Sequence, residues 1–148
     1  MKEEFLQFIW KYKLYNKAEL QSNQNENIEI INEGLHNYDS GPDFFNAKIK
    51  IKDTVWAGNV EVHINSSDWY VHKHHQDKAY DNVILQVVYN HDKEVCRTNG
   101  QLIPTLELKF DQKLLSNYDS LISQETWVPC QKEIDRVDSF TMQNWLEK

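Results

Sequence analysis

The stretch GPDFFNAKIKIKDTVWAGNVEVH, residues 41–63, decides the fold of this chain because it contains two β-strand patterns separated by a short polar turn. Apolar and polar residues alternate over 45–51 and again over 55–64, and Lys52-Asp53 lies between the two runs. Such alternation is typical of strands, in which successive side chains point to opposite faces of a sheet. The short turn predicts that the two strands pair as an antiparallel hairpin.

The second strand of this hairpin carries a candidate metal site. Glu61 and His63 share one strand face, and a hairpin would bring Asp43, which follows a Gly-Pro turn, back to the neighbourhood of Glu61. An Asp/Glu/His cluster can hold a divalent ion, with Mg²⁺ or Mn²⁺ as the expected metal and Asp43 and Glu61 as its ligands. The alternative interpretation is that Asp43 caps the turn, while Glu61 and His63 form a solvated pair on the sheet surface.

The composition indicates a folded protein without a membrane segment. The 148 residues are 40% hydrophobic, include five Trp, and contain no apolar run of the roughly 20 residues that a membrane span needs. The N-terminal stretch MKEEFLQFIWKYKLY mixes charges into its apolar positions and lacks the small-residue cleavage site of a signal peptide, so we expect a cytoplasmic protein with reduced cysteines. The net charge of −7 does not support nucleic-acid binding, although bound metal ions can offset acidic groups locally. Association with further copies of the chain is left open.

The order of the elements predicts an α+β fold with a mixed, largely antiparallel sheet flanked by helices. Helical spacing of apolar residues predicts helices over 3–15, 111–122 and 139–145. Phe5, Phe8, Ile9 and Tyr12 are expected to pack the first helix on the sheet. Further strands are expected over 28–31, 83–89, 94–97 and 102–110. The last helical pattern runs up to Lys148, so we expect residues 1–148 to form a single domain, the N-terminal part of a longer protein whose C-terminal part is its partner.

A histidine-rich segment follows the second strand of the hairpin. It reads SSDWYVHKHHQDKAYDN over residues 66–82, and either a short helix or a structured loop is compatible with it. His72 and His75 would share a helix face and are secondary candidates for metal binding. The spacing of the histidines matches no established zinc pattern, which favours surface residues of a loop packed by its aromatic side chains.

Two resemblances rest on these residues. The segments GLHNYDSGPDFFNAKIKI, WAGNVEVHINSSDWYVHKHHQDKAYDNVILQVVY and IPTLEL resemble the N-terminal part of a bacterial family catalogued only as a domain of unknown function, over roughly residues 1 to 110. Pro42-Asp43, a strand, and Glu61-x-His63 on the next strand are similar to the PD-(D/E)XK nuclease superfamily. This second resemblance implies a restriction-endonuclease-like core.

The nuclease resemblance also implies roles for individual residues. Asp43 and Glu61 would be the metal-binding carboxylates, and the additional acidic residue near the first helix would be Glu3, Glu4 or Glu19. His63 stands where the superfamily has a lysine, so a permanent cation would have to come from Lys48, Lys73 or Lys78. His63 would then assist the attacking water.

Two functions therefore stand side by side. The first is a divalent-metal-dependent phosphodiesterase, a hydrolase acting on nucleic acid, with Asp43, Glu61 and His63 as catalytic residues and Mg²⁺ or Mn²⁺ as cofactor. The alternative is a non-catalytic, nuclease-derived module for binding or assembly within a longer protein. Histidine at position 63 and the acidic charge favour the alternative, whereas the concentration of acidic and imidazole groups on two strands favours the enzyme.

Overall fold

The computed structural model describes residues 1–123 of the chain. It divides into two compact units, Met1–Lys109 and Phe110–Lys148. The second unit is described only as far as helix α3 (Gln112–Ser123), which matches the helix predicted over 111–122. The helix predicted over 139–145 lies outside the described residues. The first unit contains the sheet and all candidate site residues.

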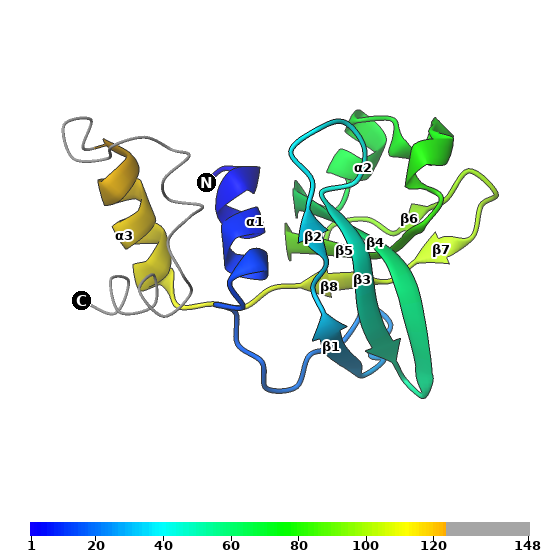
Figure 1. Cartoon of the computed structure of the whole chain (residues 1–148), viewed down its shortest axis with the longest axis horizontal. Helices are drawn as coiled ribbons and strands as arrows, with labels where there is room; N and C mark the ends of the chain where they lie inside the picture. The colour runs from blue at the N-terminus through cyan, green and yellow to red at the C-terminus, as the bar shows by residue number, and fades with distance from the viewer. Residues whose placement is uncertain (124–148) are drawn as a thin grey trace. The chain divides into compact units, whose positions relative to one another are not determined.

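The first unit is a mixed sheet with short helical segments, so the predicted α+β class is confirmed (Figure 1). The sheet has the order β1-β3-β4-β5-β8, and β2 pairs with β3. Strands β1 to β4 pair antiparallel, whereas β4, β5 and β8 run parallel to one another. Their bounds are β1 Ile28–Asn32, β2 Leu35–His36, β3 Phe44–Ile51, β4 Thr54–Asn65, β5 Val83–Asn90 and β8 Thr105–Glu107.

The predicted hairpin is present as β3 and β4, with Ile51 opposite Thr54. Lys52 has a φ of 55°, which closes the tight turn that the sequence indicated. Near its other end the pairing is interrupted between Phe44 and Ala47, and Asn46 has a φ of 60° there. This bulge locally increases the twist of β3 close to Asp43.

Strand β5 forms the centre of the core. Its first six residues are all buried, as the continuous apolar run VILQVVY predicted for a strand covered on both faces. A second, two-stranded sheet pairs β6 (Val95–Cys96) with β7 (Leu102–Ile103), in place of the longer strands expected over 94–97 and 102–110. Pro104 separates β7 from β8, because proline cannot donate a backbone hydrogen bond to a sheet ladder.

Helix α1 (Glu3–Lys11) packs against β4 and buries Phe5, Phe8 and Ile9 as expected. It ends at Lys11 rather than near residue 15, and Lys13 has a left-handed φ of 57° just beyond it. The Trp10 indole donates a hydrogen bond to the Glu33 carbonyl at 3.0 Å, which ties the helix to the chain after β1. Among the described residues, no helix is long and apolar enough to cross a membrane.

The connection from β4 to β5 contains one short helix and two 3₁₀ turns. These are α2 (Asp68–Val71), η1 (His74–Gln76) and η2 (Lys78–Tyr80). Trp69 is fully buried in a small apolar cluster with Val83, Val95 and Ile103, so it anchors the connection on the fold. Lys73 has a φ of 59°, which ends α2 and turns the chain into η1. Both readings of this segment, a short helix and a structured loop, are thus partly correct.

Candidate functional site

A half-buried and a buried carboxyl group, those of Asp43 and Glu61, meet where the start of β3 lies beside β4. Asp43 immediately precedes β3, and its Oδ2 accepts a hydrogen bond from the Val62 amide of β4 at 2.9 Å. Glu61 is only 4% exposed and lies beside the Asp43 carboxylate. Burial raises the pKa of Glu61 to about 11, and the hydrogen bond with the Asp43 side chain and the negative charges of Asp43 and Glu3 act in the same direction. Glu61 therefore carries a proton at neutral pH unless a cation replaces it.

A third carboxylate reaches this pair from helix α1. Burial, followed by the charges of Asp43 and Asp68, raises the pKa of Glu3 to about 7. Glu3 is half-buried, whereas its neighbour Glu4 and the more distant Glu19 are exposed. The acidic residue that the helix contributes is thus Glu3, and the choice of Glu4 as a secondary candidate was wrong. We refer to Glu3, Asp43 and Glu61 as the carboxylate cluster.

His63 lies two residues after Glu61 on β4 and is 1% exposed. The Gln86 side-chain amide of β5 donates from Nε2 to the Ser66 carbonyl at 3.1 Å and lies 2.9 Å from His63 Nδ1. An amide nitrogen can only donate, so His63 Nδ1 accepts and the imidazole proton resides on Nε2. Thr105 on β8 completes the row by donating to Gln86 Oε1 at 3.3 Å. In this arrangement the network orients the His63 ring and leaves its proton on Nε2.

Two further histidines approach His63 from the β4–β5 connection. The ligand atoms of His63, His72 and His74 all lie within 4.8 Å of one another, and we call these residues the histidine cluster. The His63 and His74 rings stack with a centroid separation of 5.3 Å. Burial, together with the charges of the neighbouring imidazoles, lowers the pKa of His63 to about 3 and that of His74 to about 4. These two side chains are therefore neutral at physiological pH.

The carboxylate and histidine clusters adjoin at one point. His74 Nε2 lies 3.8 Å from Glu61 Oε2. This oxygen is buried and has no hydrogen-bond partner among the described residues. A buried polar atom without a partner is costly, and it is typical of a place where a ligand or ion belongs.

The turn after β5 holds the histidine segment in place. The Asp92 carboxylate accepts hydrogen bonds from the Ser66 hydroxyl at 2.9 Å and from the Ser67 amide and hydroxyl at 2.9 and 2.7 Å. The Ser66 hydroxyl in turn accepts from the Asp92 and Lys93 amides at 3.0 and 2.9 Å. Hydrogen bonds to the turn after β5 thus hold Ser66, at the junction of β4 and α2, and the carbonyl of the same residue accepts the hydrogen bond from Gln86.

Several expectations about the site change with these contacts. Glu61 and His63 are buried, so the interpretation as a solvated surface pair is wrong. The pairing of His72 with His75 on one helix face is also wrong, because α2 ends at Val71 and His75 packs on the Tyr70 ring instead, with centroids 5.0 Å apart. The partner of His72 is His74, which shows that the segment is more than a solvated loop.

The lysines proposed to replace a cation at position 63 are all on the surface. Lys48 is exposed on β3 and stands opposite Ala57, four residues before Glu61 in β4. Lys73 and Lys78 are exposed in the β4–β5 connection. The charge at the buried end of the site thus comes from carboxylates alone.

Gln86 is a site residue that the sequence analysis missed. Its signal was present, because it is the only strongly polar residue in the buried run VILQVVY. A buried amide needs partners for its donors and acceptor, so a polar residue in such a run indicates a hydrogen-bond network.

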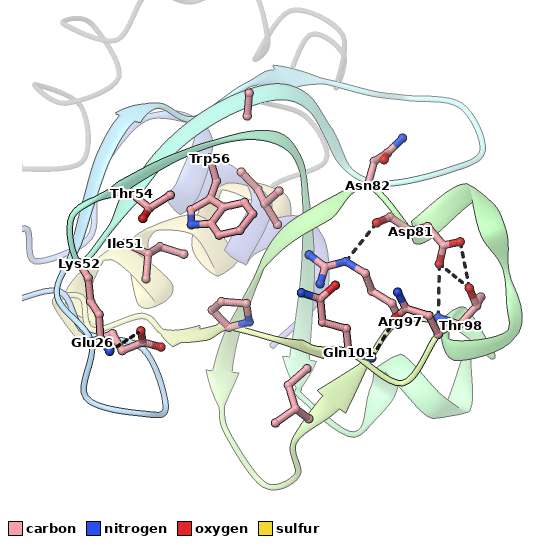
Figure 2. Close-up of a pocket in the computed structure, with 15 residues that line it drawn as sticks. Glu26, Ile51, Lys52, Thr54, Trp56, Asp81, Asn82, Arg97, Thr98 and Gln101 are labelled. Atoms are coloured by element: carbon pink, nitrogen blue, oxygen red, sulfur yellow. Dashed lines mark hydrogen bonds and ion pairs between the residues drawn. The ribbon is translucent and has the colours of Figure 1, made fainter.

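A pocket lined by residues of the first unit lies elsewhere. It has a volume of about 550 Å³, and neither the carboxylate nor the histidine cluster lines it. Figure 2 shows Trp56 and Arg97 within it, and the Arg97 guanidinium donates to the carbonyls of Asp81 and Val83 at 3.0 and 2.7 Å. Because backbone carbonyls already take these donors, Arg97 serves mainly to hold the pocket wall.

Comparison with known proteins gives a family without an assigned activity. Searches of the curated proteins and of the solved structures find no significant match to this chain. A family model described as "Protein of unknown function (DUF2851)" matches residues 3–148. The chain therefore belongs to the DUF2851 family.

Proposed function

We propose that this protein is a divalent-metal-dependent phosphodiesterase of the nuclease type, with its ion held by Asp43 and Glu61. The observation that carries the proposal is Glu61 Oε2, a buried carboxyl oxygen without a hydrogen-bond partner among the described residues. It lies beside Asp43, and Glu3 adds a third carboxylate. Without a bound cation, Asp43 and Glu61 must hold a proton between them, and a divalent ion would take the place of that proton.

The donor set fits a hard cation. Carboxylate oxygens are the ligands that Mg²⁺ and Mn²⁺ prefer, and an ion of this kind usually keeps several waters. Bound here, it would polarise a phosphodiester and lower the pKa of a water molecule. Asp43 is already oriented by the Val62 amide, so its Oδ2 is held in place before any ion arrives. Glu3 would balance the charge from the side of helix α1.

The order of elements supports a nuclease-type activity. A helix, three antiparallel strands, a connection and a parallel strand follow one another as α1, β1, β3, β4, the 66–82 segment and β5. The nuclease superfamily that residues 42–63 resemble has this order in its core. On this resemblance, Asp43 and Glu61 would correspond to its metal-binding carboxylates.

His63 would act in this enzyme as a neutral donor. Since Gln86 leaves the proton on Nε2, the imidazole can donate a hydrogen bond to a phosphate oxygen or a water molecule but brings no permanent positive charge. The lack of a permanent positive charge at His63 also supports the second candidate, a nuclease-derived module that binds metal without hydrolysis.

The proposal is tested by metal-induced stabilisation together with hydrolysis of labelled single- and double-stranded oligonucleotides. Mn²⁺ or Mg²⁺ should raise the melting temperature of the wild type by mass action. Asp43→Asn should abolish both this rise and the hydrolysis, and Glu3→Gln should weaken both. Glu4→Gln is the matched control, because Glu4 is the exposed neighbour of Glu3 on the same helix.

The outcomes separate the two candidate functions. Stabilisation without hydrolysis would favour the non-catalytic module. A melting temperature that does not respond to either ion, or that responds equally in wild type and Asp43→Asn, would refute the carboxylate site.

A further inference from the structure

We infer that His63, His72 and His74 form a second metal site, which takes a borderline transition-metal ion such as Zn²⁺ rather than Mg²⁺. This inference goes beyond the proposed function and does not rest on it, because Glu3 and Asp43 take no part. It rests on the convergence of three imidazoles from two segments of the chain, β4 and the α2–η1 turn.

The geometry is close to that of an occupied site. The three ligand atoms lie within 4.8 Å of one another. Nitrogen ligands at about 2.1 Å from a tetrahedral ion are about 3.4 Å apart. The side chains therefore need to approach by roughly an ångström, and His72 lies on the exposed side of the cluster, where its imidazole has room to rotate.

The chemistry of the cluster selects the metal. Imidazole is a poor ligand for Mg²⁺ but suits Zn²⁺, Fe²⁺ and Co²⁺. Three protein ligands leave a fourth position for water or an anionic oxygen, which is typical of catalytic zinc. Glu61 Oε2 lies 3.8 Å from His74 Nε2, so a carboxyl group adjoins the histidine cluster.

Gln86 can support His63 as a ligand. Metal binding through Nε2 requires the imidazole proton on Nδ1, and Gln86 must then accept through its carbonyl oxygen. Rotating the Gln86 side-chain amide by half a turn exchanges the places of its nitrogen and oxygen, so that the oxygen faces His63 Nδ1. The Thr105 hydroxyl can donate or accept, so it serves Gln86 in either orientation, and only the Ser66 carbonyl loses its donor.

A pair of neighbouring histidines provides the test. His72 is exposed, so His72→Ala should fold like the wild type while lacking one ligand. His75→Ala is the matched control, because His75 lies three residues along the same segment and packs on Tyr70 outside the cluster. Thermal melts without metal check that both variants are folded. The protein should carry no affinity tag, since tags of histidines bind the same ions.

Calorimetric titration with ZnCl₂, and the visible spectrum of the Co²⁺ complex, measure the site directly. The wild type and His75→Ala should bind one equivalent, and His72→Ala should lose at least about tenfold in affinity. MgCl₂ in excess should not displace the ion. Equal Zn²⁺ affinity in His72→Ala and His75→Ala would overturn the inference.

Asp43→Asn distinguishes this site from the proposed phosphodiesterase site. It should keep Zn²⁺ binding while losing the response to Mg²⁺. Loss of Zn²⁺ binding in Asp43→Asn but not in His72→Ala would mean that the carboxylate cluster holds the zinc and that the histidine site does not exist.

Discussion

Replacing Glu61 by glutamine should stabilise the metal-free protein at alkaline pH. In the folded protein the pKa of Glu61 is raised to about 11, against an ordinary value of 4.5. Between these values folded Glu61 holds a proton that the unfolded chain releases. The contribution of Glu61 to stability is therefore fully present below about pH 4.5 and falls as the pH rises towards 11. Glutamine is neutral throughout, and its amide can still donate a hydrogen bond to Asp43 in place of the protonated carboxyl.

The size of the effect follows from the one proton that the folded state binds and the unfolded state releases. Each pH unit changes the free energy of unfolding by at most about 1.4 kcal/mol when the two states differ by one bound proton. From about pH 7.5 to about pH 9 the wild type should thus lose about 2 kcal/mol more than Glu61→Gln. Other shifted groups contribute little in this window. His63 and His74 change protonation at lower pH, and Glu3, whose pKa is about 7, has released most of its proton at the start of this window.

Urea unfolding in EDTA, followed by tryptophan fluorescence at several pH values, measures this difference. Glu4→Gln should keep the wild-type slope, because the Glu4 side chain is exposed. Adding Mn²⁺ should reduce the slope of the wild type, since the ion replaces the proton, and should not affect Glu61→Gln. If the free energy of unfolding changed with pH in parallel for wild type and Glu61→Gln, folded Glu61 would be ionised, and Asp43 and Glu61 would hold no proton between them.

Two other substitutions test how the fold supports the site. A Cβ on Gly58 would lie 2.5 Å from the Asn82 carbonyl, so Gly58→Ala should lower the free energy of unfolding by about 1–3 kcal/mol; an unchanged urea midpoint would contradict this close approach. Asp92→Ala removes the carboxylate that accepts hydrogen bonds from Ser66 and Ser67, and this change should lower the free energy of unfolding by about 1–3 kcal/mol. These hydrogen bonds, chiefly that of Ser67, lower the pKa of Asp92, so the wild type should lose the contribution as the pH falls below the ordinary value of 3.8. A variant with wild-type stability at neutral pH would show that the clamp is dispensable.

The sequence by itself determined the elements whose signal is local. The hairpin β3–β4 followed from alternation and a two-residue turn, and β5 followed from an unbroken apolar run. Both signals reflect burial of one or two strand faces, which depends on residues next to each other in the chain. The proximity of Asp43 and Glu61 could also be predicted, because pairing of the two hairpin strands brings the start of the first strand next to the later part of the second.

Only the tertiary structure decided which partners these residues meet. Glu3 reaches the carboxylate pair because α1 packs on β4, and no periodicity distinguishes it from Glu4. His74 joins His63 because Lys73 adopts a left-handed conformation that ends one helix and redirects the chain. Gln86 contacts His63 because β4 and β5 lie side by side in parallel. Contacts of this kind join segments separated by ten or more residues, and their geometry depends on how helices and strands pack, which local sequence patterns do not encode.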